Sequence, residues 1–415
     1  MRNRPWYRID VLFYCLLLLP IIVCSQLQRL YVNPRTPASE KQSQIVDSIR
    51  FIPLEQREGL SVSGYSFVEP TEKYFLIGDY PNKSVLLYKK NGDFVKKINY
   101  KKLGDNFYPT YQRHSNQLVF FGTNKNYALT GKDQIEISLD WANPRNKKYF
   151  KKYTVDLGDT AFAIREVAPE EADIAGATYY SNGSYWRGKI NTSTLYKDSS
   201  DYELKIYRNS QLVKGFFPYN RINEARFLYS EESTELDEAG IPDTYLLTRA
   251  YCDTVYRMMN DSLVPAYHLV LPLENSLPKS FFTTPFKNKT ERENFGRNNA
   301  WMLHQVYGFY ETPRFVFFNI SYLNNYESYI YRKQGNVTYK AKNIKADSSQ
   351  YNLQLLGDFG IVRQGSTFYK LQKAGDLLLF FEQHKGVPVP EELERFLKSK
   401  PQPSAPVIVQ FKLKN

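Results

Sequence analysis

One short pattern recurs four times along the chain and constrains its fold more than any other feature. It consists of a β-branched residue or Leu, then Tyr, then a basic residue, a short polar turn and an apolar pair. It occurs at residues 87–95, 206–213, 255–264 and 330–338. The turns contain Asn, Gly or Asp, which adopt the positive φ of tight hairpins at little cost. The sequence therefore predicts repeated antiparallel β-hairpins.

Each hairpin belongs to a larger repeating unit, seen best in residues 74–98, 241–271 and 313–344. In these segments a further strand precedes the hairpin, which gives three or four antiparallel strands. A sheet of this size cannot bury both faces alone, so such units pack side by side in a ring. We therefore predict an all-β fold, a β-propeller made mainly of four-stranded antiparallel sheets.

The spacing of the hairpins indicates how many blades the propeller has. A period of about 50–60 residues leaves room for further units at residues 116–157 and 355–381. Six blades result, with five or seven as open alternatives. We expect the strong strand at residues 406–413 to pair with residues 45–52 and so protect the edges of the ring. Residues 390–398 carry the one clear helix signal, with Pro first, acidic residues next and Lys last.

The N-terminus is typical of a secretory signal peptide. Three Arg residues precede a thirteen-residue apolar run that ends at Val23. A transmembrane helix needs about 20 apolar residues, so an uncleaved anchor is disfavoured. We predict a signal peptide at residues 1–25, a linker at 26–43 and a single propeller domain at 44–415. Cleavage before Gln26 and a lipobox with lipidation of Cys24 both stay open.

Charge and location limit the partners that we expect. Removal of residues 1–25 leaves +10 of the formal net charge of +12. Such a charge attracts anions over long range. Because the chain is predicted to be exported, we do not expect nucleic acid as a partner. We predict a monomer in the periplasm, on the outer membrane surface or outside the cell, in contact with the membrane only through a lipid anchor. The remaining Cys252 has no partner for an intramolecular disulfide, and we expect it to be buried and inert.

The chain resembles the six-bladed β-propeller proteins that are abundant among the secreted proteins and lipoproteins of Bacteroidetes, which are distant relatives of NHL-repeat propellers. The resemblance is carried by residues 52–55, 88–94, 253–256 and 406–409. It implies a propeller fold and a location in the cell envelope. It supplies no general set of catalytic residues.

Two segments between the predicted strands combine aromatic, amide and basic side chains. Aromatic rings stack on sugars while amides and guanidinium groups bind hydroxyl or anionic groups, and binding residues concentrate on loops held by rigid scaffolds. The candidate binding residues are Arg297, Asn298, Asn299, Trp301 and His304 in the first segment and Tyr185, Trp186 and Arg187 in the second. We therefore predict a non-catalytic propeller that binds a glycan, a peptide or a protein.

The sequence contains no recognisable catalytic motif. A phosphate-binding loop, a dinucleotide-binding Gly motif and a Gly-x-Ser-x-Gly motif are all missing, and the four His residues lack paired ligand spacing. We predict no catalytic residues, no metal and no cofactor. The alternative is a metal-assisted hydrolase, lactonase or lyase with Ca²⁺ in the axial channel. Its oxygen ligands would come from Asp79, Glu166, Asp253 and Asn319.

Overall fold

The structure is a computed structural model. It describes residues 27–57, 60, 67–104, 107–123, 149–169, 178–179, 185–188, 200–209, 211–220, 235–239, 244–259, 261–284, 286–357 and 361–414. The predicted signal peptide and Cys24 lie outside these residues. Among the helices in the described ranges, none is long and apolar enough to cross a membrane.

The described residues form mostly β-structure, arranged in six sheets that each contain four antiparallel strands. In chain order, the first three sheets contain β4 (Phe67–Pro70), β5 (Tyr74–Asp79), β6 (Ser84–Lys89) and β7 (Phe94–Asn99); β8 (Tyr108–Gln112), β9 (Gln117–Thr123), β10 (Phe150–Asp156) and β11 (Arg165–Val167); and β12 (Thr178–Tyr179), β13 (Tyr185–Gly188), β14 (Ser200–Arg208) and β15 (Gln211–Asn220).

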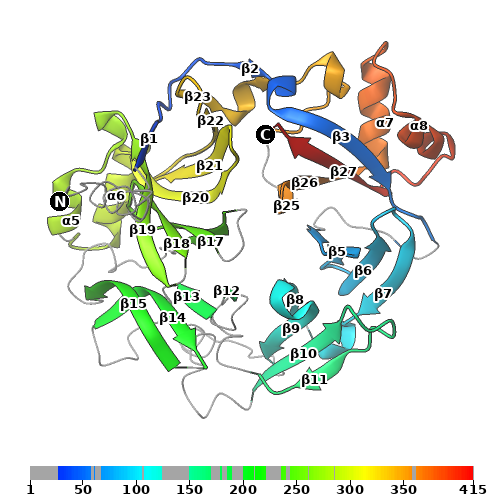
Figure 1. Ribbon diagram of the computed structural model, residues 1–415, viewed down its shortest axis with the longest axis horizontal. Coiled ribbons are helices and arrows are strands. Elements are labelled where there is room, and N and C mark those ends of the chain that lie inside the picture. The colour runs from blue at the N-terminus through cyan, green and yellow to red at the C-terminus, as the bar shows by residue number, and fades with distance from the viewer. Residues whose placement is uncertain are drawn as a thin grey trace, which may run out of the picture.

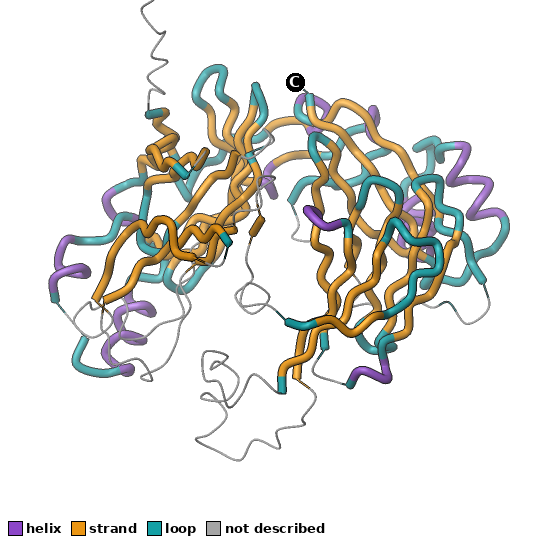
Figure 2. Tube along the Cα trace, turned by 60° about the horizontal axis from the view of Figure 1, so that its bottom comes forward, coloured by secondary structure: helices purple, strands orange, loops and turns teal. Residues whose placement is uncertain are grey.

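The next two sheets contain β16 (Glu235–Glu238), β17 (Thr244–Thr248), β18 (Thr254–Met259) and β19 (Ser262–Val270); and β20 (Leu303–Glu311), β21 (Phe315–Tyr322), β22 (Tyr326–Arg332) and β23 (Val337–Lys340). The last contains β25 (Ile361–Gln364), β26 (Thr367–Lys373), β27 (Pro406–Leu413) and β3 (Val46–Pro53). Figure 1 shows the sheets placed around a common centre, with β8, β12, β20 and β25 on the inner side. Figure 2, turned by 60°, shows the strands in groups whose members run alongside one another. The arrangement is propeller-like.

All four predicted hairpins are confirmed, and each forms the β6–β7, β14–β15, β18–β19 or β22–β23 pair of its sheet. The predicted pairing of the two end segments is also confirmed. β27 lies between β26 and β3, with Val409 opposite Phe51 and Lys370. Strands from the two ends of the chain thus complete one sheet.

The segment predicted as a linker contains two further strands. β1 (Gln28–Tyr31) pairs in parallel with β19, and β2 (Glu40–Lys41) pairs in parallel with β24 (Ile344–Lys345). Leu30 and Val32 are buried, and the hydroxyl of Tyr331 on β22 donates a hydrogen bond to the carbonyl of Arg29. The segment is ordered because it covers the β19 edge and buries apolar side chains against it.

The described residues include four α-helices, which lie between or beside the strands: α5 (Lys279–Thr283), α6 (Lys289–Asn298), α7 (Ala374–Gln383) and α8 (Glu391–Lys398). The helix predicted at 390–398 is confirmed as α8. The strand reading of residues 374–381 is wrong, because this part of the predicted last unit forms α7. Leu377 and Phe381, one helical turn apart, are both buried on the same side of α7. The spacing thus follows a helical period, whereas a strand would bury alternate residues.

Among the described residues, apolar clusters join five of the six pairs of successive sheets. One joins Leu76 and Val85 of the β4–β7 sheet to Leu118 and Phe120 of the next sheet. Others join β14 to β17 and β18, the β16–β19 sheet to the β20–β23 sheet, and the latter to the sheet that contains β27. A further cluster joins Ile408 on β27 to Ile77 and neighbouring residues of the β4–β7 sheet. The last sheet therefore packs against the first.

Candidate functional site

The segment that links β19 to β20 forms a hollow beside Trp301. The segment was predicted as a loop, which is wrong for residues 290–298, because they lie in α6. Asn288 caps this helix by accepting a hydrogen bond from the Glu291 N–H at 2.9 Å, and Glu291 Oε2 accepts one from the Lys287 N–H at 2.6 Å. This reciprocal cap starts the helix in a stretch without a strong apolar stripe.

The hollow has a volume of about 630 Å³. Three predicted residues line it: Asn298 at the end of α6, and Asn299 and Trp301 in the following turn. Arg35, Glu274, Asn275, Lys340 and their neighbours complete the wall. The buried Asn275 donates a hydrogen bond from Nδ2 to the Trp301 carbonyl at 2.8 Å and fixes the turn.

Trp301 is held on one side and exposed on the other. Its ring lies 5.2 Å from that of the buried Tyr322 on β21, measured between centroids, yet 40% of Trp301 remains exposed. A Trp that filled a gap between sheets would be buried. The exposed ring instead provides an apolar surface beside two Asn side chains, as stacking on a sugar requires.

The other two predicted residues of this segment point elsewhere. Arg297 donates a hydrogen bond to Asn294 Oδ1 at 2.6 Å and does not line the hollow. His304 lies on β20, where Nδ1 is 3.3 Å from Ser321 Oγ and the ring contacts Tyr251. The hydrogen bonds within α6 and the strand direction of β20 turn these side chains away. Only part of the predicted set therefore comes together.

The second predicted segment cannot be assessed in the same way. Tyr185, Trp186 and Arg187 lie on β13, between β12 and β14, so this segment is a strand rather than a loop. Their side chains lie outside the described part of the structure. The prediction that these three residues bind a ligand therefore stays a prediction.

The four oxygen donors of the metal-assisted alternative lie against separate partners. Asp79 Oδ2 accepts a hydrogen bond from Asn82, Glu166 pairs with Lys151, Asp253 faces His268 at 3.3 Å, and Asn319 Oδ1 accepts one from Ser328 at 2.6 Å. Within the described ranges, no three His, Cys, Asp or Glu residues gather as a group that could hold a metal ion. Cys252 is free and half-buried, so it is less buried than predicted.

A polar network that the sequence did not suggest links the inner strands of four sheets. Arg113, just after β8, binds Glu238 on β16 through Nη1 at 2.7 and 2.8 Å and lies 3.4 Å from Glu69 on β4. It also donates to the carbonyl of Arg363 on β25, and Arg363 donates to the carbonyl of Glu238 at 2.7 Å. Residues from four distant parts of the sequence thus meet at the inner strands of these sheets.

A bulge in β20 places two backbone N–H groups beside the acidic residues of β16. Tyr307 pairs with Asn319 and Tyr310 with Phe317, so Gly308 and Phe309 together face one residue of β21. Gly308 has φ of 58°, and a Cβ there would lie 2.7 Å from Asn319 Nδ2. Its missing side chain allows both the turn and the close approach. The Phe309 N–H consequently donates to Asp237 Oδ2 at 2.7 Å.

Two carboxyl groups of β16 hold protons more strongly than usual. Burial, together with the nearby Asp237, raises the pKa of Glu235 to about 7. Burial also raises the pKa of Asp237 to about 6, against the opposing effects of the Phe309 N–H and of Arg363. Both groups are therefore less stable as anions here than in the unfolded chain.

The raised pKa values predict a pH effect on stability. The folded chain binds these two protons more tightly than the unfolded chain does, so protonation of Glu235 and Asp237 stabilises the fold. This contribution to the free energy of unfolding is fully present below about pH 4 and is lost as the pH rises through 6 and 7. The double variant Glu235→Gln, Asp237→Asn keeps the shapes but removes the charges. We expect it to be about 2 kcal/mol more stable than the parent at pH 8, after allowance for partial solvent screening.

Urea denaturation of both proteins from pH 4 to pH 8 measures this difference. We expect the gap between parent and variant to widen with pH. Glu391→Gln, on the exposed face of α8, serves as a control and should show no such widening. A parent whose stability relative to the double variant is constant or rises with pH would contradict the prediction.

Comparison with known proteins supports the fold only. No family model matches the chain, and no curated protein matches its sequence. The crystal structure of a Bacteroides fragilis protein assigned as exported is similar, with a TM-score of 0.57 and 14% identity over 94% of this chain and 100% of that chain. At this identity the likeness concerns the path of the chain and not its chemistry.

Weaker similarities include two other solved structures. A member of the DUF4221 family from Bacteroides vulgatus has a TM-score of 0.42 and 10% identity, over 90% of this chain and 100% of its own. Virginiamycin B lyase from Staphylococcus aureus has a TM-score of 0.35 and 8% identity, over 88% of this chain and 99% of its own. Neither similarity assigns a function to this chain.

Proposed function

We propose that the chain is an exported, non-catalytic six-bladed propeller that binds an oligosaccharide in the hollow beside Trp301. The six four-stranded sheets are the blades, and the sheet that joins β27 to β3 closes the ring. The support for closure is the apolar cluster of Ile408 and Ile77, which packs the last sheet against the first. A closed ring leaves each inner face covered by a neighbour.

Export is supported by two independent observations. The N-terminus has the basic, apolar and small-residue order of a signal peptide. The similar Bacteroides fragilis protein is assigned as exported. Cleavage before Gln26 would release the protein, whereas lipidation of Cys24 would hold it at a membrane surface.

The observation that carries the binding function is the ring of Trp301, which packs against Tyr322 and is still 40% exposed. Its contact with Tyr322 fixes the ring, so little side-chain entropy remains to be lost when a ligand stacks on it. Asn298 and Asn299 both line the hollow. Asn299 Nδ2 donates to the Phe295 carbonyl at 2.9 Å, so the amide of Asn298 and Oδ1 of Asn299 are the groups that would bind sugar hydroxyls. Arg35 and Lys340 also line the hollow, but Arg35 lies 3.6 Å from Glu274 and Lys340 lies 3.2 Å from Glu327, so their charges are balanced and we propose a neutral oligosaccharide.

The test is the binding of the purified protein without residues 1–25 to a glycan array, followed by calorimetry with the oligosaccharide that binds best. We expect Trp301→Ala to weaken binding about tenfold or more, since a central aromatic residue contributes a large share of binding energy. Melting temperatures of the parent and variant show whether the fold is kept.

Tyr326→Ala is the matched control, because Tyr326 is 66% exposed on β22 and does not line the hollow. We expect it to bind the oligosaccharide as the parent does. Absence of binding to every glycan would overturn the sugar function. Equal weakening by both variants would overturn the assignment of the site.

A further inference from the structure

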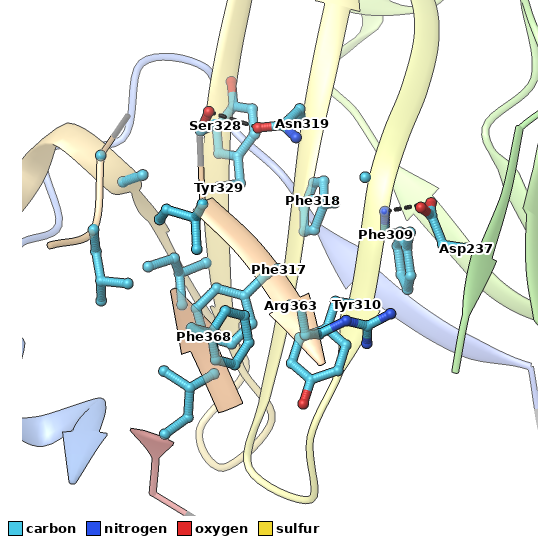
Figure 3. A pocket seen from close by; sticks show the side chains of 17 residues that line it. Asp237, Phe309, Tyr310, Phe317, Phe318, Asn319, Ser328, Tyr329, Arg363 and Phe368 are labelled. Atoms are coloured by element: carbon cyan, nitrogen blue, oxygen red, sulfur yellow. Dashed lines mark hydrogen bonds between the residues drawn. The ribbon is translucent and has the colours of Figure 1, made fainter. Parts of the chain in front are cut away.

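A second cavity lies between the inner strands β16, β20 and β25, with β21 and β22 behind it. Its volume is about 340 Å³, at the lower end of the range for small-molecule pockets. The exposed Gly308 and the half-buried Asn319 and Ser328 lie along its wall, so solvent reaches it. Most of the wall is apolar, with six aromatic and five aliphatic residues among the seventeen that line it. Figure 3 labels the aromatic ones: Tyr310, Phe317 and Phe368, which belong to the cluster beside β27, and Phe309, Phe318 and Tyr329, which belong to the cluster toward the β16–β19 sheet.

Arg363 presents an unsatisfied donor at this cavity. Its Nη1 is buried and makes no hydrogen bond of good geometry with a described residue, although Tyr310 lies against the guanidinium and stabilises its charge. Nη2 donates to the carbonyl of Glu238, and the guanidinium carbon lies 4.0 Å from the centre of the Tyr310 ring. These contacts fix the guanidinium in place. A buried charged donor without an acceptor is costly, so an oxygen atom from a ligand would be stabilised there.

Asp237 presents the opposite charge on the same cavity. Oδ2 accepts the hydrogen bond from the Phe309 N–H, and no described residue donates to Oδ1. Figure 3 shows the Arg363 guanidinium directed toward the side of the cavity where Asp237 lies. The two side chains influence each other electrostatically but form no direct ion pair. A ligand can therefore contact both.

The charges select the class of ligand. A ligand with only a carboxylate would satisfy Arg363 but would be repelled by Asp237. A ligand with only an ammonium group would satisfy Asp237 and leave Nη1 of Arg363 without an acceptor. A ligand with both groups adds no net charge to a largely apolar space.

We propose that this cavity binds a free α-amino acid with an apolar side chain. Its carboxylate accepts from Arg363 Nη1, its ammonium group donates to Asp237, and its side chain packs against the apolar wall beside Tyr310, Phe317 and Phe368. This site is separate from the Trp301 hollow and does not depend on the proposed sugar binding.

Calorimetry with L-phenylalanine, phenylacetate and 2-phenylethylamine tests the proposal, because the three probes share a ring and differ in charged groups. We expect L-phenylalanine to bind. Each analogue with a single charged group should bind at least about tenfold more weakly, because it lacks one charged hydrogen bond. Phenylacetate or 2-phenylethylamine binding as tightly as L-phenylalanine would overturn the two-contact arrangement. Failure of L-phenylalanine and L-leucine to bind would overturn the site.

Two variants connect binding to the named residues. Arg363→Met and Asp237→Asn should each weaken L-phenylalanine binding about tenfold or more. Arg314→Met is the control, since Arg314 also lies over an aromatic ring, at 5.5 Å from Phe315, but does not line the cavity. Asp237→Asn is expected to be more stable than the parent above pH 7, so its loss of binding would not result from unfolding. Unchanged binding by both variants would overturn the proposal.

Discussion

Removal of residues 404–415 is expected to abolish cooperative folding. This truncation deletes β27, which pairs with β26 on one side and β3 on the other. It also removes a run of buried side chains, from Pro406 to Val409 with Phe411 and Leu413. Each large side chain contributes about 1.5–3 kcal/mol when fully buried, so the total loss is as large as the usual stability of a domain. Urea denaturation followed by circular dichroism measures the effect.

The matched control is Lys412→Ala in the full-length chain, because Lys412 is exposed on the same strand. We expect that change to alter stability by less than about 0.5 kcal/mol. A synthetic peptide of residues 401–415, added to the truncated chain, should restore part of the native signal by filling the vacant strand position. A truncated chain that unfolds as cooperatively as the full chain would show that the end-to-end pairing is not needed.

The hairpins could be predicted from sequence because they depend on local chemistry. The turn at Gly92 needs positive φ, which the structure has at 97°, and the flanking residues alternate as strands do. The pairing of the two ends was predictable because residues 45–52 and 406–413 are both strong strand segments at the ends of the repeated units, where a ring would leave an unpaired edge. These features could be predicted without knowing how the sheets pack against one another.

The helices and the inner network were less predictable. α6 depends on the cap between Asn288 and Glu291, a signal that the aromatic and amide residues after it had obscured. α7 contains Leu and Phe at positions that also suit a strand, and only the burial of Leu377 and Phe381 shows the helical period. The lesson is that short apolar runs are ambiguous without their caps.

The candidate sites likewise differ in whether their residues are close together or far apart in the sequence. Asn298, Asn299 and Trp301 were predicted together because they are neighbours in sequence, and the turn after α6 keeps them together. Arg363 and Asp237 are far apart in sequence, and only the packing of β16 beside β20 and β25 brings them to one cavity. The acidic run at β16 was the available signal, but Glu-rich stretches more often face solvent.

A buried ion pair between neighbouring sheets provides the second large expected effect. Arg249, which follows β17, binds Glu203 on β14 through two hydrogen bonds of 2.7 and 2.9 Å. The two side chains are only 11% and 6% exposed, and the Arg249 guanidinium lies 3.7 Å from the centre of the Phe217 ring. Burial lowers the pKa of Arg249, but Glu203 more than reverses this effect. The pair is therefore charged and depends on both members.

We expect Arg249→Met to lower the free energy of unfolding by about 3–5 kcal/mol, because it leaves the Glu203 carboxylate buried without its cation. The double variant Glu203→Leu, Arg249→Met removes both charges and should recover most of that loss, as measured by urea denaturation. Arg395→Met breaks the exposed pair with Glu391 on α8 and should change stability by less than about 1 kcal/mol. If the double variant is as unstable as Arg249→Met, the packing of the Arg249 side chain on Phe217, rather than its charge, holds the two sheets together.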